Sequence, residues 1–206
     1  ASGGTLETMF SMGELDLGDD LTDPFLLNPK DSYSDEQKQL SSDRVGIAKK
    51  PEISAWSGPF IMATANTRVV RRTEALLALR QESYGSNFTY QEHAFHKSWF
   101  SAAKSLILTG LSVLVLLSPL KRLVKPFLPK PGEGPSESVQ ENGWFDCKYI
   151  VETDDGTKSV FNMNGKGDPG YKVTSKLVSE CALCLIENED ALPGGKEYGG
   201  VLTSAS

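Results

Sequence analysis

The chain has 206 residues, of which 39% are hydrophobic and 23% are charged, which fits a globular protein of one domain or one and a half. Its three cysteines, Cys147, Cys181 and Cys184, are too few and too clustered for a disulfide framework. We therefore expect a reducing, intracellular compartment.

The formal net charge of −6 hides a segregated distribution. Residues 1–60 hold five Lys and Arg against eleven Asp and Glu, and residues 132–206 hold six against thirteen, whereas residues 61–131 hold ten against three. A basic middle beside an apolar segment suits anionic lipid headgroups or a phosphate-bearing ligand. The basic residues do not interleave with aromatic ones, so we expect no nucleic-acid partner.

The N-terminal quarter of the chain carries little hydrophobic periodicity. Residues 2–14 predict a helix with its apolar side chains on one side. Residues 16–51 are acidic and interrupted by prolines, which predicts a long surface loop with one short helical turn. A loop of that length within a compact domain points to a functional excursion or to partial disorder.

The pattern then predicts a helix from Asn66 to Arg80, with Asn66 as its N-cap and an apolar stripe from Val69 to Leu77. Three arginines gather near its start: Arg68, Arg71 and Arg72. Arginines in a first turn oppose the helix dipole and need a reason. Two interpretations stay open, namely solvated or ion-paired arginines, and a site where backbone N–H and guanidinium groups converge on a phosphate or carboxylate.

Residues 88–95 alternate between apolar and polar side chains, which predicts a strand. His93 and His96 lie within and beside it. Without a nearby ligand of matching geometry they are interpreted as strand surface, and we expect no metal site.

A strongly apolar segment follows from Trp99 to Leu128, in which nearly every side chain between Leu106 and Leu117 is apolar. It predicts a helix over residues 99–118 that is either covered by protein or inserted into a membrane surface. A full span is disfavoured because about 20 apolar residues are needed to cross a bilayer. The candidate membrane contacts are Leu106, Leu111, Leu114, Leu117, Lys121, Arg122 and Lys125. A serine and threonine stripe along this helix leaves a homodimer open.

Beyond a linker at 129–143 the pattern sharpens. Alternation from Phe145 to Val151, followed by Asp154-Asp155-Gly156, predicts a β-hairpin whose second strand is 159–164. A helix is predicted over 173–189. Cys181 and Cys184 fall on its apolar stripe, so we interpret both thiols as small core residues rather than as a redox pair.

The stretch 165–170 matches the G-x-G-x-x-G pattern of dinucleotide-binding loops. The strand before it is predicted to be a hairpin arm, and Pro169 removes an N–H donor where a pyrophosphate needs one. We therefore interpret this stretch as a glycine-rich connection near a ligand cleft.

Five short motifs occur in a fixed order along the chain. They are Ser57-Gly58-Pro59-Phe60-Ile61-Met62-Ala63, Asn66-Thr67-Arg68-Val69-Val70-Arg71-Arg72, Tyr84-Gly85 with Phe88 and Tyr90, Gly167-Asp168-Pro169-Gly170-Tyr171 and Gly199-Gly200-Val201-Leu202-Thr203. Together they resemble the part downstream of the nucleotide-binding domain in saccharopine dehydrogenase-like oxidoreductases, a group that includes the mycobacterial trans-acting enoyl reductases. The likeness covers residues 1–10 and 57–206.

The resemblance implies an α+β fold, with a mixed or antiparallel sheet and helices on one face, that covers the cleft of an N-terminal Rossmann domain. That domain, which would bind NAD(P), has no counterpart here, and the sequence also begins without a methionine. We therefore expect a substrate and lid portion cut from a longer protein, inactive alone and with its cofactor bound elsewhere. Eukaryotic members of the group are associated with lipid droplets and membranes.

The expected organisation has four parts: 1–56, an N-terminal helix and acidic loop; 57–128, an α/β segment; 129–143, the linker; and 144–206, completing the same domain. The resemblance implies a substrate or anion site, for which the candidates are Asn66, Arg68, Arg71, Arg72, Asp168 and Tyr171, while the catalytic residue is unknown. The leading function is the substrate-binding part of an NAD(P)-dependent oxidoreductase acting on a lipid-like or acyl substrate. The alternative is a non-catalytic module that docks on a membrane or lipid droplet.

Overall fold

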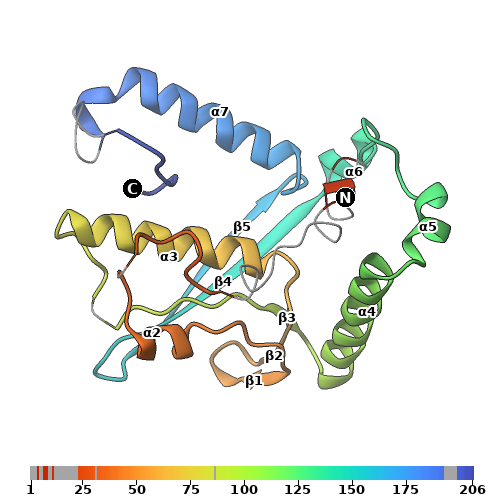
Figure 1. Cartoon of the computed structure of the whole chain (residues 1–206), viewed down its shortest axis with the longest axis horizontal. Coiled ribbons are helices and arrows are strands. Elements are labelled where there is room, and N and C mark those ends of the chain that lie inside the picture. The colour runs from red at the N-terminus through yellow and green to blue at the C-terminus, as the bar shows by residue number, and fades with distance from the viewer. Residues whose placement is uncertain are drawn as a thin grey trace. The chain divides into compact units, whose positions relative to one another are not determined.

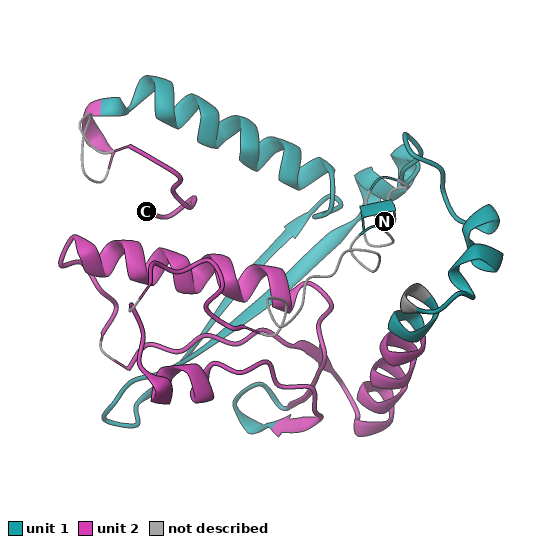
Figure 2. Ribbon diagram, viewed as in Figure 1, with its two compact units in different colours: residues 1–15, 50–54, 112–189 teal, residues 16–49, 55–111, 190–206 magenta. Residues whose placement is uncertain are grey.

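The computed structural model describes residues 23–30, 32–85, 87–192 and 199–206, together with residues 4, 7, 8 and 11, and omits the side chains of Leu116 and Leu117. It is an α+β structure with two small sheets built on antiparallel pairing (Figure 1). The chain divides into two compact units (Figure 2). Unit 1 comprises residues 1–15, 50–54 and 112–189, and unit 2 comprises residues 16–49, 55–111 and 190–206.

Unit 2 holds the larger set of buried residues. In chain order it contains α2 (Asp35–Leu40), β1 (Ala48–Lys50, whose last residue belongs to unit 1), β2 (Ala55–Gly58), α3 (Ala63–Leu79), β3 (Ala94–His96) and most of α4 (Trp99–Leu117). A capping box starts α2, because the Ser34 side chain accepts from the backbone of Gln37 while the Gln37 side chain accepts from the backbone of Ser34. This helix and β1 occupy the region predicted as a loop with one helical turn.

The sheet of unit 2 has the strand order β1-β2-β3, with Gly58 of β2 opposite Ala94 of the antiparallel β3. A Cβ atom at Gly58 would lie 3.2 Å from Nε2 of His96, so the close approach of this side chain favours glycine. The predicted strand over 88–95 was wrong in extent. Residues 88–93 are irregular, and pairing is confined to Ala94–His96.

The helix predicted from Asn66 begins earlier, at Ala63, with Met62 at the N-cap position, so the prediction of an Asn66 cap was wrong. Its apolar stripe is confirmed in its C-terminal half, where Thr73, Leu76 and Leu77 are buried. The buried apolar side chains among the described residues all lie in unit 2, and they are Phe25, Ala55, Ala75, Leu76, Leu77 and Ala102.

Unit 1 contains mostly exposed elements. They are the 3-10 helix η2 (Pro51–Ile53), the end of α4, α5 (Lys121–Val124), η3 (Lys125–Phe127), α6 (Glu137–Asn142), β4 (Trp144–Glu152), β5 (Lys158–Lys166), α7 (Lys172–Glu187) and the start of η4 (Glu189–Ala191). The predicted linker is therefore interrupted by a short helix, α6, which begins because the Ser136 side chain caps it through the Val139 N–H.

The predicted hairpin is confirmed and extends by a residue or more at each end, with Trp144 opposite Lys166 and Glu152 opposite Lys158. At its turn Gly156 has a φ of 81°, a conformation that favours glycine. Glycine is also favoured at position 165, because a Cβ atom there would lie 2.5 Å from the ring of Phe145 on the neighbouring strand.

The helix after the hairpin is confirmed as α7, but its predicted burial was wrong. No described residue of α7 is buried, and Cys181 and Cys184 are exposed free thiols rather than core residues. The burial was predicted from sequence periodicity alone. Periodicity shows which face of a helix is apolar, but it does not show whether another part of the protein packs against that face.

The helix predicted over 99–118 is confirmed as α4, of which Ala102 is fully buried. Most of its large apolar side chains are exposed, including Phe100 at 79% and Leu114 at 62%. In the described part of this helix, protein therefore covers the side of Ala102 and leaves most of the remaining surface open. The helix predicted over 2–14 is described only at residues 4, 7, 8 and 11, which are helical, and otherwise lies outside the described residues.

Candidate functional site

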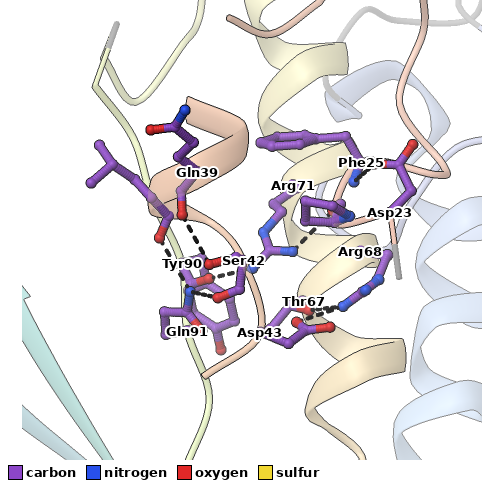
Figure 3. Close-up of polar contacts among 12 residues, drawn as sticks. Asp23, Phe25, Gln39, Ser42, Asp43, Thr67, Arg68, Arg71, Tyr90 and Gln91 are labelled. Carbon is purple, nitrogen blue, oxygen red and sulfur yellow. Dashed lines mark hydrogen bonds and ion pairs between the residues drawn. The ribbon is translucent and has the colours of Figure 1, made fainter. Parts of the chain in front are cut away.

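The three arginines of α3 do not lie in its first turn, because the helix starts at Ala63. N–H groups of the first turn are engaged within the chain, since that of Ala63 donates to the carbonyl of Phe60 and that of Ala65 to the carbonyl of Met62. Arg68 and Arg71 are buried, and both point into the polar contacts between α3 and irregular segments of unit 2 (Figure 3).

Arg71 is the most deeply buried of the three, with 2% of its surface exposed. Its two terminal nitrogens each donate over 2.9 Å, one to the carbonyl of Pro24 and the other to that of Tyr90. Its guanidinium carbon lies 5.7 Å from the centroid of the Phe25 ring, within reach of a cation–π interaction. The arginine thereby joins two segments that are far apart in sequence to one side of α3.

The electrostatic setting of Arg71 is unusual for a cation. Desolvation, and next the neighbouring positive charge of Arg68, lower the pKa of Arg71 from 12.5 to about 10, against an opposing effect of Asp43. Its Nε atom is buried without a hydrogen-bond partner. The guanidinium group stays protonated at neutral pH and is compensated mainly by carbonyl dipoles.

The other two arginines are also committed to partners within unit 2. Arg68 donates to the Asp43 carboxylate over 2.7 Å and to the Thr67 hydroxyl over 3.2 Å. Arg72 donates to the carbonyls of Leu27 and Val201, the latter over 2.7 Å. The contact of Arg68 with Asp43 is an ion pair, whereas Arg72 donates to backbone carbonyls, and an anion site on the same helix stays a prediction.

Asn66 forms a polar cluster with two residues that the sequence did not single out together. Its amide donates to the Glu92 carboxylate over 2.9 Å, and the Tyr90 hydroxyl donates to the other oxygen of Glu92 over 3.1 Å. The partners Asp43 and Glu92 lie about 25 residues from their contacts along the chain, and no local periodicity could have identified them.

Asp168 and Tyr171 belong to unit 1, in the connection from β5 to α7. The Asp168 N–H donates to the carbonyl of Gln140 over 2.8 Å, and its own carbonyl accepts from Val173 over 3.0 Å. One carboxylate oxygen of Asp168 is buried without a hydrogen-bond partner. Tyr171 occupies the N-cap position of α7, and its side chain does not form a capping hydrogen bond.

The glycine-rich stretch at 165–170 follows a hairpin arm, as predicted. Its Gly167 has a φ of 98°, which a glycine adopts readily, and Gly167 donates to the carbonyl of Gly143. Its N–H groups at 167 and 168 both serve the α6 junction, so they are engaged within the protein rather than arranged for a phosphate.

The candidate membrane contacts have mixed environments. Leu111 and Leu114 are exposed, Leu106 is half-buried, and the Leu117 side chain lies outside the described residues. Lys121 and Arg122 belong to α5, and Lys125 of η3 forms an ion pair with Glu7 at 2.8 Å. Within the described residues, no helix combines the length and apolar content that crossing a membrane requires.

His96 is the last residue of β3 in the sheet of unit 2, and His93 directly precedes that strand. Nδ1 of His96 is 3.4 Å from the Ser101 hydroxyl, and its Nε2 atom is buried close to Gly58. In the part of the chain that the structure describes, no cluster of three or more His, Cys, Asp or Glu could hold a metal ion.

Comparison with known proteins gives relatives but no family model and no solved structure, since neither of those two comparisons finds a match. The chain is 35% identical over 223 aligned positions to "Putative trans-acting enoyl reductase Rv2449c" of Mycobacterium tuberculosis, covering 100% of this chain and 51% of that protein. It is 32% identical to a trans-acting enoyl reductase of Mycobacterium leprae and 31% identical to one of Mycobacterium bovis, covering 90% of this chain and 46% of each relative.

The chain thus spans about half the length of the curated relatives that it matches. Identity above 30% over nearly the whole chain indicates common descent of the matched regions. On this evidence the chain is homologous to about half of proteins that carry the name trans-acting enoyl reductase.

Proposed function

We propose that this chain is the substrate-binding and lid portion of a saccharopine dehydrogenase-like, NAD(P)-dependent oxidoreductase that acts on a lipid-like or acyl substrate. In this proposal the chain corresponds to the half that follows a Rossmann domain, and it is inactive without that half. The observation that carries the proposal is its similarity, along its whole length, to about half of proteins named trans-acting enoyl reductase.

Two features of the structure support a protein in which this chain contacts the substrate and the other half binds the cofactor. The one glycine-rich stretch that matched a nucleotide-binding pattern is engaged in the junction of α6, β5 and α7, so a cofactor would bind elsewhere. The exposed apolar surfaces of α4 and α7 offer contacts for an acyl chain or for another domain.

The experiment that tests the proposal uses the natural polypeptide that carries this sequence. Its intact mass is measured first, because a Rossmann domain of ordinary size adds roughly 100 to 150 residues. NADPH and NADH are then titrated into it, with tryptophan quenching as the readout. Saturable binding of either nucleotide supports the proposal, and a polypeptide of this length alone that binds neither would contradict it.

Within this proposal Arg72 is the first anion contact to test, because its guanidinium group is partly exposed whereas those of Arg68 and Arg71 are buried. Asn66 is proposed as a further anion contact, and Asp168 and Tyr171 are proposed separately as substrate contacts of unit 1. Arg72→Glu in the natural polypeptide should weaken binding of an acyl-CoA probe about ten-fold or more, the loss expected for one charge-assisted hydrogen bond. An unchanged dissociation constant, with Arg80→Glu as the matched control, would remove the anion role and leave the reductase proposal standing.

A second candidate function is docking on a membrane or lipid-droplet surface, and one specific observation favours it. On α4, the exposed residues Phe100, Ile107, Leu111 and Leu114 recur at helical spacing, so they form a single apolar stripe. No acidic residue occurs between Glu92 and Glu133, a stretch that contains Lys121, Arg122 and Lys125. An apolar stripe followed by cations is the pattern of interfacial helices.

Flotation with liposomes of mixed neutral and anionic phospholipid tests this candidate. Leu111→Glu and Leu114→Glu should each reduce the floated fraction, because each places a charge on the apolar stripe. Leu79→Glu is the matched control, since Leu79 is exposed at the end of α3. Equal flotation of all variants, with helix content preserved by circular dichroism, would exclude docking through α4.

A further inference from the structure

Within unit 1, the apolar face of α7 is uncovered. It consists of Val173, Leu177, Val178, Cys181, Cys184 and Leu185, which fall on one side of the helix by their spacing. Leu177 is 59% exposed and Leu185 is 62% exposed, and no residue of the helix is buried. An amphipathic helix of this length in water lacks the packing that normally stabilises it.

The hairpin in the same unit shows the same deficit. Phe161 and Met163 of β5 are exposed, as is Trp144 of β4. A hairpin of two strands is at best marginally stable unless a further strand or a helix packs on it. Phe161 and Met163 share one face of the hairpin, and Trp144 lies on the other, so apolar side chains are exposed on both faces.

The charges on α7 indicate a protein rather than a lipid surface as the occupant. Its four ionised residues, Lys172, Lys176, Glu180 and Glu187, balance one another and fall within one sector of the helix, beside the apolar face. An anionic membrane therefore gains no electrostatic attraction from this helix, in contrast to the cationic segment after α4.

The length of the relatives indicates which part of the protein covers the apolar face of α7. This chain spans 51% of one relative and 46% of another, so polypeptides of that kind carry a second half of similar size. A domain tethered in the same polypeptide has a high effective concentration, so an interface of modest area suffices to hold it.

We propose that the apolar face of α7 is the surface on which the second half of such a polypeptide packs, burying Cys181 and Cys184. This inference rests on the proposed function, in which that half is the nucleotide-binding domain. The two thiols then act as reporters, since they are exposed in this chain and covered in the longer protein.

The test measures alkylation of the natural polypeptide by N-ethylmaleimide, with site-resolved mass spectrometry of Cys181 and Cys184. In the native protein both thiols should react at least about ten-fold more slowly than in urea, because only local opening exposes a packed surface. Leu177→Asp should restore reactivity, whereas Lys176→Asp, outside the apolar face, should leave both thiols protected. Native thiols that react as fast as those in urea would overturn the inference.

A photo-crosslinker, p-benzoylphenylalanine, placed at Leu177 identifies the occupant. Crosslinks to residues outside this sequence support the inference, and crosslinks within it or to a second copy overturn it. NADPH titration of the same preparation separates the two proposals. A protein that binds NADPH but has reactive thiols overturns the α7 interface alone, and one with protected thiols that binds no nucleotide overturns the proposed function alone.

Discussion

At the scale of single residues, Arg71 shows how a charge can serve the fold. A buried guanidinium group normally needs a carboxylate, yet here two carbonyl groups accept its hydrogen bonds. Each neutral carbonyl becomes a stronger partner when its donor is charged. The segments around Pro24 and Tyr90 carry little secondary structure, and this side chain links both to α3, beside the contacts of Arg72 with Leu27 and of Asn66 with Glu92.

Arg71→Met should therefore loosen two segments at once. The substitution retains most of the buried apolar volume but removes two hydrogen bonds from a charged donor to carbonyl groups, at a cost of roughly 2 to 4 kcal/mol. Hydrogen exchange measured by mass spectrometry should rise in the segments around residues 24–28 and 88–91. Arg72→Met is the control and should raise it less, because Arg72 is not buried. Equal exchange in wild type and Arg71→Met would show that the segments are held by other contacts.

The partners of these arginines illustrate what the sequence could not provide. Local periodicity predicted that Arg68, Arg71 and Arg72 lie on one helix. Asp43, the partner of Arg68, comes from a stretch whose sequence predicts an acidic loop. Pairing over such a separation depends on how unit 2 folds, and a single sequence without tertiary information carries no signal for it.

At the scale of elements, the β4–β5 hairpin was predictable because its signals are local. Alternation fixes which residues share a face, and the Asp-Asp-Gly turn sets the register. The burial of α7 was not predictable, because it depends on a partner surface. The start of α3 was misplaced for a related reason, since a good capping residue at Asn66 carried more weight than the helix-compatible residues before it.

The hairpin turn should loosen in acid. The Asp155 carboxylate accepts hydrogen bonds from the Thr153 hydroxyl and the Thr157 N–H, which lower the pKa of Asp155 from 3.8 to about 2. A carboxyl whose folded pKa lies below its unfolded pKa stabilises the folded state above the unfolded value, and that contribution is lost as the pH falls. Between pH 3.8 and pH 2 the Thr157 amide should lose its protection from hydrogen exchange. Asp155→Asn keeps an acceptor, and its turn should not respond over this range; a response identical to that of wild type would exclude the carboxylate as the cause.

The junction between α6 and β5 should depend on the absence of a side chain at Gly143. A Cβ atom there would lie 2.6 Å from the backbone of Asp168, which cannot move without disturbing its hydrogen bond to Gln140. Gly143→Ala should lower stability by about 1 to 3 kcal/mol, in the range of overpacking. Gly110→Ala is the matched control, because Gly110 has nothing within 4 Å of its Cβ position and lies within α4. That control should be neutral or stabilising, and a Gly143→Ala variant as stable as wild type would show that the junction is adaptable.

At the scale of the whole molecule, the two units differ in how much apolar surface they bury. The buried apolar side chains described all belong to unit 2, whereas unit 1 leaves much of its apolar surface exposed on α7 and the hairpin. Folding stability rests largely on apolar burial. A chain with this distribution gains from an additional covering surface, as the proposed second half would provide.

This imbalance predicts that the chain expressed alone binds a hydrophobic dye more strongly, per molecule, than the natural longer polypeptide does. Exposed apolar patches bind such dyes and favour association. Replacing Leu177 and Leu185 together by glutamine should lower dye fluorescence of the isolated chain, because both lie on the exposed face of α7. Val201→Gln, at an exposed residue outside that face, should change it little. If the isolated chain sediments as a monomer and binds no more dye than the longer polypeptide, unit 1 covers its own apolar surface in solution, and no second half is needed to do so.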